Sequence, residues 1–187
     1  MIKKVGVIGS GTMGSGIAQV AATAGSTVQL YDLSAEALQK SRDSLDKILA
    51  RLIEKGRIDN AEKNRIQNNI TYISNLNDLA NCDLTIEAII EDLDIKKKLF
   101  KELESLLSPK AIIATNTSSL SVASIAGALS DPSRCIGIHF FNPAPLMKLV
   151  EVIPAVQTSE QTLKTTVDTI AAWGKTVAVT KAPRALS

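Results

Sequence analysis

Short apolar segments alternate with longer amphipathic segments along the whole chain. The apolar runs are typical of strands buried on both faces, and they are Val5–Ile8, Thr27–Tyr31, Leu84–Ile90, Ala111–Ala114, Cys135–Phe140, Leu149–Ile153 and Thr176–Thr180. The segments with helical spacing or composition are Met13–Ala24, Ala35–Lys55, Ala61–Asn69, Asp94–Leu107, Val122–Leu129 and Glu160–Trp173. This alternation predicts an α/β fold in which helices cover both faces of a parallel sheet.

One pair of helical segments is longer than a crossover between parallel strands requires. Ala35–Lys55 is long and charged, and Gly56–Asn60 separates it from the next helix. We therefore expect residues 34–70 to form an inserted helical hairpin that projects from the sheet. A long solvated helix with no function of its own is the alternative.

Composition and charge narrow the functional classes. The 187 residues are 45% hydrophobic and 21% charged, which is typical of a globular domain with a substantial core. The net charge is +2, and the longest basic cluster is residues 96–98, so nucleic-acid binding has little electrostatic support. No apolar run approaches the roughly 20 residues that span a bilayer.

Cysteine and histidine usage predicts neither a metal site nor a disulfide. Cys82 and Cys135 lie far apart without a CxxC pair, and the chain has one histidine. Free thiols in a reducing compartment are the expected state. The chain opens directly into an apolar strand, MIKKVGVIG, with no leader-like segment, so we expect a cytoplasmic protein.

A glycine-rich turn follows the first expected strand. Gly9, Gly11 and Gly14 give the spacing G-x-G-x-x-G at the start of a helix, and Asp32 ends the next strand. The glycines allow a tight turn, close approach of a pyrophosphate and close helix–strand packing, while the carboxylate suits the ribose hydroxyls of NAD. The residues expected to contact this cofactor are Gly9, Gly11, Thr12, Met13, Gly14 and Asp32. A glycine turn in a nucleotide-free α/β fold is the alternative.

Polar side chains also follow three later strands. Glu91, Asn116 and Asn142 each come after an expected strand, and the carboxyl ends of parallel strands form the ligand-binding edge of such sheets. Any one of these strand-end segments could instead serve a helix cap or a turn: Ser119 or Ser121 could cap the helix expected over Val122–Leu129, and Asn142 could serve a turn before Pro143. The convergence of all three favours a site.

Four motifs with this mutual spacing resemble those of the NAD-binding domain of 3-hydroxyacyl-CoA dehydrogenases. They are the glycine fingerprint with Asp32, EAIIEDLDIKKKLF (87–100), TNTSSL (115–120) and GIHFFNPAPLMKLVEV (137–152). Within the family, the bacterial 3-hydroxybutyryl-CoA dehydrogenases are the most similar subgroup. The resemblance implies a Rossmann-like, doubly wound, mostly parallel sheet, with NAD as cofactor and no metal.

The resemblance also implies the roles of the catalytic residues. His139 is the expected general base that removes the 3-hydroxyl proton, and Glu151 holds and polarises its ring. Ser118 is expected to bind the substrate oxygen, and Asn142 to contact both cofactor and substrate. An imidazole with a pKa near ~6.5 suits this proton transfer at neutral pH. Without the other motifs, a lone histidine on a strand would be read as a core residue.

Further binding residues follow from the same resemblance. Glu91, Lys96 and Asn116 are expected to contact NAD. Lys55, at the end of the long helix, is expected to contact the CoA portion of the substrate, which would give the projecting hairpin a use.

The resemblance stops near the end of the chain. We expect residues 1–182 to form the NAD-binding dehydrogenase domain and residues 183–187 to be an atypical tail, where the family continues into a linker and a helical domain. That helical domain supplies most of the family's dimer interface, so self-association of this chain stays open. A truncated chain, a frameshifted end and a natural short product all fit this ending.

Three functional hypotheses remain. The first is NAD-dependent oxidation of (S)-3-hydroxyacyl-CoA to 3-oxoacyl-CoA, and the reverse reduction, in fatty-acid or butanoate metabolism, with impaired turnover by this short chain. The second is a gulonate or crystallin-like NAD dehydrogenase, which shares the fingerprint and a similar histidine motif. The third is a non-catalytic NAD-binding module.

Overall fold

Eight strands form one sheet in the computed structural model, which describes residues 1–117 and 121–180. The strands are β1 (Lys4–Ile8), β2 (Thr27–Tyr31), β3 (Ile70–Ile73), β4 (Leu84–Glu87), β5 (Ile112–Thr115), β6 (Cys135–Phe140), β7 (Leu149–Pro154) and β8 (Thr176–Val179). Their order across the sheet is β3-β2-β1-β4-β5-β6-β7-β8. Only β6 and β7 pair antiparallel in this part of the chain, so the expected mostly parallel, doubly wound sheet is confirmed.

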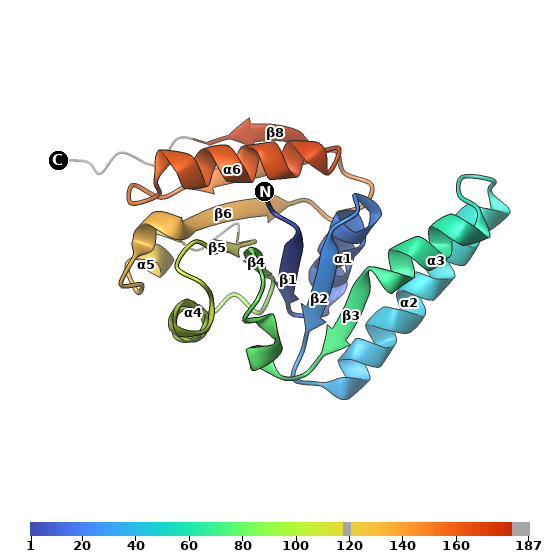
Figure 1. Ribbon diagram of the computed structural model, residues 1–187, viewed down its shortest axis with the longest axis horizontal. Helices are drawn as coiled ribbons and strands as arrows, with labels where there is room; N and C mark the ends of the chain where they lie inside the picture. Colours follow the sequence, from blue (N-terminus) through green and yellow to red (C-terminus); the bar gives the residue numbers. More distant parts are fainter. Residues whose placement is uncertain (118–120, 181–187) are drawn as a thin grey trace.

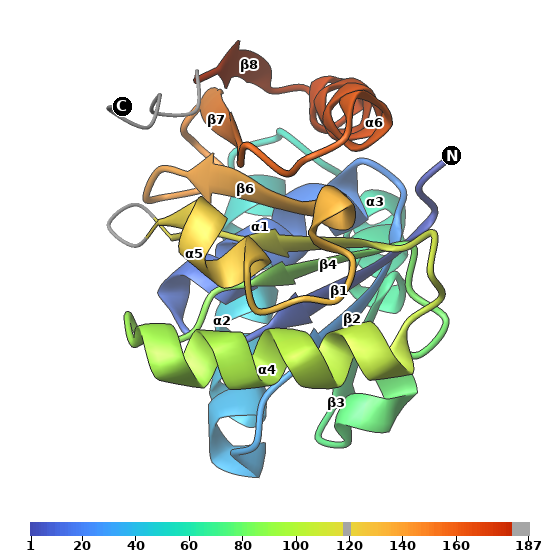
Figure 2. The ribbon, with the colours of Figure 1, turned by 90° about the vertical axis from the view of Figure 1, so that its left-hand side faces the viewer.

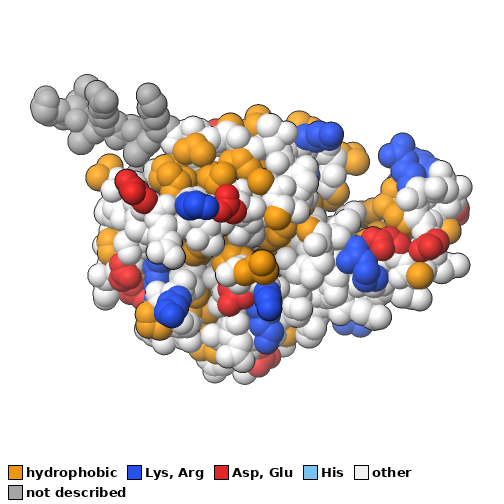
Figure 3. Space-filling model, turned by 45° about the horizontal axis from the view of Figure 1, so that its top comes forward, with side chains coloured by type: hydrophobic (Ala, Val, Ile, Leu, Met, Phe, Trp, Pro, Cys, Tyr) orange, Lys and Arg blue, Asp and Glu red, His pale blue; other side chains and the backbone are white. Residues whose placement is uncertain are grey.

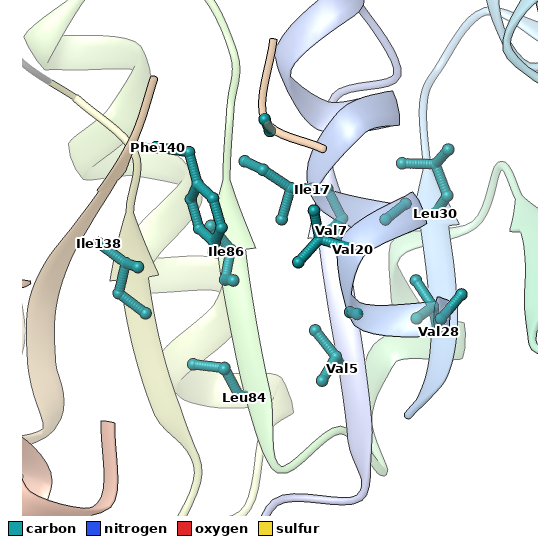
Figure 4. Packing of buried hydrophobic residues seen from close by; sticks show 14 of the residues in the cluster. Val5, Val7, Ile17, Val20, Val28, Leu30, Leu84, Ile86, Ile138 and Phe140 are labelled. Carbon is teal, nitrogen blue, oxygen red and sulfur yellow. The ribbon is translucent and has the colours of Figure 1, made fainter. Parts of the chain in front are cut away.

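Helices cover both faces of this sheet (Figures 1 and 2). They are α1 (Thr12–Thr23), α2 (Ala35–Glu54), α3 (Asn60–Asn68), α4 (Leu93–Leu106), α5 (Val122–Ala126) and α6 (Glu160–Ala172), with short 3-10 turns η1 (Leu76–Leu79) and η2 (Pro132–Arg134). Alternate residues of each strand point to opposite faces, which divides the core into two clusters. One cluster joins the sheet to α1, α2, α3 and α6, and the other joins it to α4 and α5. Figure 4 shows the first cluster, with Ile17 and Val20 of α1 beside Val5 and Val7 of β1.

The helices α2 and α3 form a two-helix arm that extends beyond strand β3 (Figure 1). Each helix begins at a side-chain cap: the Ser34 hydroxyl accepts the Ala37 N–H at 3.1 Å, and the Asp59 carboxylate accepts the Glu62 N–H at 2.8 Å. Figure 3 shows the end of the arm separated from the body of the molecule, with Lys and Arg side chains at that end. The expected hairpin is therefore present.

Three elements differ from their expected form. The strand expected over Leu84–Ile90 ends at Glu87, because the Glu87 carboxylate accepts the Ile89 N–H at 2.8 Å and turns the chain. The helix expected over Val122–Leu129 ends at Ala126, and the next turn is closed by bonds to carbonyls three residues back. Strand β3 was not anticipated; it pairs with β2 directly after the arm.

The expectations for Ser118, for the candidate cap Ser119 and for the tail 183–187 fall outside the described residues. Among the residues that are described, no helix combines the length and the apolar character needed to cross a membrane.

Candidate functional site

The predicted site residues gather along one edge of the sheet, where the parallel strands end. The loops after β1, β2, β4, β5 and β6 all leave from this edge, since these strands run in the same direction. The glycine fingerprint follows β1, Asp32 follows β2, Glu91 follows β4, Asn116 follows β5, and His139 lies near the end of β6.

The glycine loop has the geometry that its spacing predicts. Gly9 has a φ of +102°, which favours glycine, and a Cβ there would lie 2.7 Å from the Ala88 carbonyl oxygen. A Cβ on Gly14 would overlap the carbonyl oxygen of Gly9, so helix α1 packs directly on the loop. At Gly11, by contrast, a Cβ would meet nothing within 4 Å. Backbone surrounds the first and third glycines, and the second faces open space.

The N-terminus of α1 lies at this open space. Gly11 is its N-cap residue, so no side chain caps the helix, and the first turn holds no acidic residue. The free N–H groups and the positive end of the helix dipole therefore remain available to an anion. An uncapped helix end beside an unobstructed glycine fits the pyrophosphate of a dinucleotide.

Asp32 is fixed by hydrogen bonds from its neighbours. Its carboxylate accepts the Ser10 N–H at 2.9 Å, the Ser10 hydroxyl at 2.8 Å and the Ser34 N–H at 2.9 Å. Burial alone would raise the pKa of Asp32, but these hydrogen bonds outweigh it and lower the pKa below its usual value. The group is thus an anion at neutral pH. A carboxylate has about four acceptor positions, which leaves capacity for a ribose hydroxyl.

His139 and Glu151 lie opposite each other on the antiparallel pair β6 and β7. His139 Nδ1 is 3.6 Å from Glu151 Oε1, within ion-pair range but longer than a hydrogen bond. The histidine side chain is 17% exposed and that of the glutamate 30%, so neither is a closed core residue. The ring of Phe141 packs edge-on against the imidazole, with centroids 4.6 Å apart.

The loop after β5 is tied to the strand that carries this histidine. Asn116 Oδ1 accepts the Phe140 N–H at 2.8 Å, beyond the last β5–β6 pair, and the Asn116 N–H donates to the Glu87 carbonyl. Asn116 thus joins the ends of three strands. Asn142 lies one residue beyond Phe141 and precedes a cis proline. Ser118, expected beside the substrate, is outside the described residues.

Lys96 occupies a different setting from the one that a direct cofactor contact suggests. Its side chain is 1% exposed, and its ammonium donates to the carboxylate of Glu87, which is 0% exposed, at 2.6 Å. The same ammonium lies 3.6 Å from Glu91 Oε1. Glu91 also accepts the Thr117 hydroxyl at 2.6 Å. The contacts of Glu91 and Lys96 with NAD remain predictions, and the structure adds a buried partner to each.

Lys55 lies away from the strand ends, at the C-terminus of α2 in the arm, where it is exposed. Its predicted contact with CoA is not tested by its position alone.

Several residues of the site were missed from the sequence. Glu87 had a signal, since it is a charged residue within an apolar run. The sequence carries no signal for Thr115 or Ser10, because hydroxyl residues at strand ends are common. The Thr115 hydroxyl donates to Glu87 at 2.7 Å, and the Ser10 hydroxyl donates to Asp32. Among residues 1–117 and 121–180, no group of three or more His, Cys, Asp or Glu side chains could hold a metal ion.

Comparison with known proteins identifies the family of the chain. The sequence model of the "3-hydroxyacyl-CoA dehydrogenase, NAD binding domain" matches residues 4–182. The chain is 45% identical to a 3-hydroxybutyryl-CoA dehydrogenase of Bradyrhizobium diazoefficiens over 97% of its own length and 62% of the relative's. It is 42% identical to the mitochondrial hydroxyacyl-coenzyme A dehydrogenase of Sus scrofa, covering 94% of this chain and 58% of that protein.

A solved structure agrees with these relatives. The (S)-3-hydroxybutyryl-CoA dehydrogenase PaaH1 from Ralstonia eutropha superposes with a TM-score of 0.95 at 38% identity, over 97% of this chain and 64% of that one. The chain thus spans a little under two thirds of the length of these relatives.

Proposed function

Because the chain belongs to the 3-hydroxyacyl-CoA dehydrogenase family through its NAD-binding domain, we propose that it serves the NAD-dependent interconversion of (S)-3-hydroxyacyl-CoA and 3-oxoacyl-CoA. Fatty-acid or butanoate metabolism is the proposed setting. The reaction removes a hydride from the carbinol carbon and a proton from its hydroxyl group.

The facing pair His139 and Glu151 is the observation that carries this proposal. With Nδ1 directed at Glu151, Nε2 is the nitrogen left to accept the hydroxyl proton of the substrate. The nearby carboxylate stabilises the imidazolium as it forms and favours a proton on Nδ1 beforehand. In the reverse direction, the imidazolium returns the proton to the oxygen of a 3-oxo group.

NAD supplies the hydride acceptor when it is bound. The uncapped start of α1, at Gly11, Thr12 and Met13, suits its pyrophosphate, and the anionic Asp32 suits the ribose hydroxyls of the adenosine half. Glu91 and Asn116, at the ends of the middle strands, are proposed to bind toward the nicotinamide half. Lys96 is proposed to act there together with Glu91.

Substrate contacts are proposed for Ser118, Asn142 and Lys55. Asn142 follows the histidine strand and can reach both ligands. Exposed Lys55 on the projecting arm suits the phosphates of CoA, since an ammonium at the tip of an arm can follow a long, charged ligand.

We also propose that residues 1–182 act as one NAD-binding domain with residues 34–70 as its helical insertion. Both cysteines are free and buried, which supports the proposed cytoplasmic setting.

The test combines NADH titration by fluorescence with the reduction of acetoacetyl-CoA, followed as NADH oxidation. The proposal expects saturable NADH binding and measurable reduction. His139→Gln should keep NADH affinity and lose reduction, because the proton donor is removed while the cofactor contacts remain. Reduction by His139→Gln at the rate of the unmodified chain would contradict the assigned base.

Two comparisons separate the other hypotheses. Lys55→Met should raise KM for acetoacetyl-CoA and leave NADH affinity unchanged, whereas an enzyme that acts on gulonate would oxidise that sugar acid and ignore CoA. NADH binding without turnover on either substrate would identify a binding module.

A further inference from the structure

The segment 141–148, between strands β6 and β7, carries the Phe141 ring that packs against His139. Asn142 is the next residue. The segment contains no helix or strand, and its own closure is a turn in which the N–H groups of Leu146 and Met147 both donate to the Pro143 carbonyl. Two backbone bonds within a short exposed turn hold a segment weakly, so its position depends on outside contacts.

Lys175 supplies the strongest of these contacts. It lies just before β8, and its ammonium donates to the Ala144 carbonyl at 2.7 Å and to the Met147 carbonyl at 2.8 Å. None of the ion pairs formed among residues 1–117 and 121–180 includes it. Burial lowers its pKa, as expected for an ammonium that has left water for two neutral carbonyls. Lys175 is thus partly buried without a carboxylate partner among the described residues, and its ammonium binds backbone carbonyls instead.

The segment also packs against helix α1. A Cβ on Gly16 would lie 3.2 Å from both Ala144 Cβ and Pro145 Cδ, so the helix and the segment are in close contact. The Thr176 N–H adds a bond to the Lys148 carbonyl at 2.9 Å. The segment is thus held between the helix that begins at the dinucleotide loop and the start of β8.

We propose that Lys175 is a positioning residue: it anchors segment 141–148 and so holds the Phe141 ring against His139, with Asn142 as the next residue. The consequence for the cofactor and the substrate rests on the proposed function, whereas the anchoring itself does not. Charged donors to backbone carbonyls form stronger bonds than neutral ones, and Lys175 makes two of them.

The single histidine of the chain makes the anchoring measurable without any ligand. In a chain labelled with ¹³C-histidine, the imidazole signals in the NMR spectrum come from His139 alone. Lys175→Met keeps the apolar stem and removes the donors, so it should shift these signals as the Phe141 ring leaves its place. Lys175→Arg should return them toward their original positions, and Lys164→Met, on the exposed face of α6, should not move them. In a Phe141→Leu background, Lys175→Met should shift the signals much less, since the ring that reports the movement is gone.

Unchanged His139 signals in Lys175→Met would overturn the proposal, and so would an equal shift in Lys164→Met. If Lys175→Met lacks a cooperative thermal transition, Lys175→Gln is measured in its place. The amide of the glutamine can donate to one carbonyl at a time, so we expect an intermediate shift of the His139 signals. The absence of any shift in Lys175→Gln would overturn the proposal. NADH binding by Lys175→Met should weaken about tenfold. Absence of NADH binding in the unmodified chain would refute the proposed function alone, because the ligand-free spectra still decide the role of Lys175.

Discussion

Removing the ammonium from the buried pair of Glu87 and Lys96 should destabilise the fold strongly. The two side chains are 0% and 1% exposed, and 2.6 Å separates their charged atoms. In Lys96→Met the carboxylate stays buried with two neutral donors, the Ile89 N–H at 2.8 Å and the Thr115 hydroxyl at 2.7 Å. Breaking one side of a buried pair costs about 3–5 kcal/mol. The two remaining hydrogen bonds place our expectation near ~3 kcal/mol, the lower end of that range.

A double variant separates the loss of the pair from a loss of packing. Glu87→Gln alone should also destabilise, because it leaves the Lys96 ammonium buried without its nearest counter-charge. Combining Glu87→Gln with Lys96→Met removes both charges and keeps an amide that can accept and donate in place of the carboxylate. Replacing a whole buried pair by neutral groups is often nearly neutral, so the double variant should be more stable than Lys96→Met alone.

The assay is urea unfolding followed by far-UV circular dichroism, with the free energy extrapolated to water. Lys164→Met is the matched control, since it removes an ammonium from an exposed pair with Asp168, and its midpoint should not change measurably. A cost below about 1 kcal/mol for Lys96→Met would refute the reasoning, as that is the value of an exposed pair. Additive costs in the double variant would refute it equally, because a direct pair must couple.

Three further predictions concern the glycine loop, Asp32 and the thiols. Gly11→Ala should fold normally but lose NADH affinity, because its Cβ enters the space kept for the pyrophosphate, whereas Gly14→Ala should lower the thermal midpoint sharply, since its Cβ overlaps loop backbone. The pKa of Asp32 is lowered in the folded chain, so the carboxylate stabilises the fold above the unfolded-state pKa of about 4. This contribution is lost as the pH falls through the folded-state pKa. The difference in unfolding free energy between the unmodified chain and Asp32→Asn should therefore disappear in acid. Burial raises the pKa of Cys82 to about 11 and that of Cys135 to about 12, so a thiol reagent at pH near ~8 should label neither until the chain unfolds.

The fold was largely predictable because its strands and helices differ in apolar period. The strand β3 shows the limit of that signal. Its four residues, ITYI, contain only two buried apolar side chains, Ile70 and Ile73, and two asparagines precede them. So short a run is a strand only because β2 offers an open edge for pairing, which is a tertiary effect that local sequence does not record.

The sequence identified the residues of the site better than it identified the contacts between them. His139 and Glu151 were paired through the family resemblance, since their separation in sequence does not fix a strand register. A slip of one residue would have placed the glutamate on the other face of the sheet. The observed register places them opposite each other. Glu87 and Lys96 lie in the same motif, 87–100, but its spacing does not show that the two side chains pair, and Lys175 belongs to no motif.

Most strand ends that form the site are joined to a neighbour by a side chain rather than by loop packing alone. Asp32, directly after β2, binds the loop after β1, Glu87 of β4 binds Thr115 of β5, and Asn116 binds the backbone of β6. Each bond links the ends of adjacent strands, so the sheet fixes the positions of the loops. A catalytic site needs its groups held before the ligand arrives, since ordering them afterwards costs binding free energy. Among the described residues, segment 141–148 receives no such bond from β5 or from the loop after it, and Lys175 donates two hydrogen bonds to this segment.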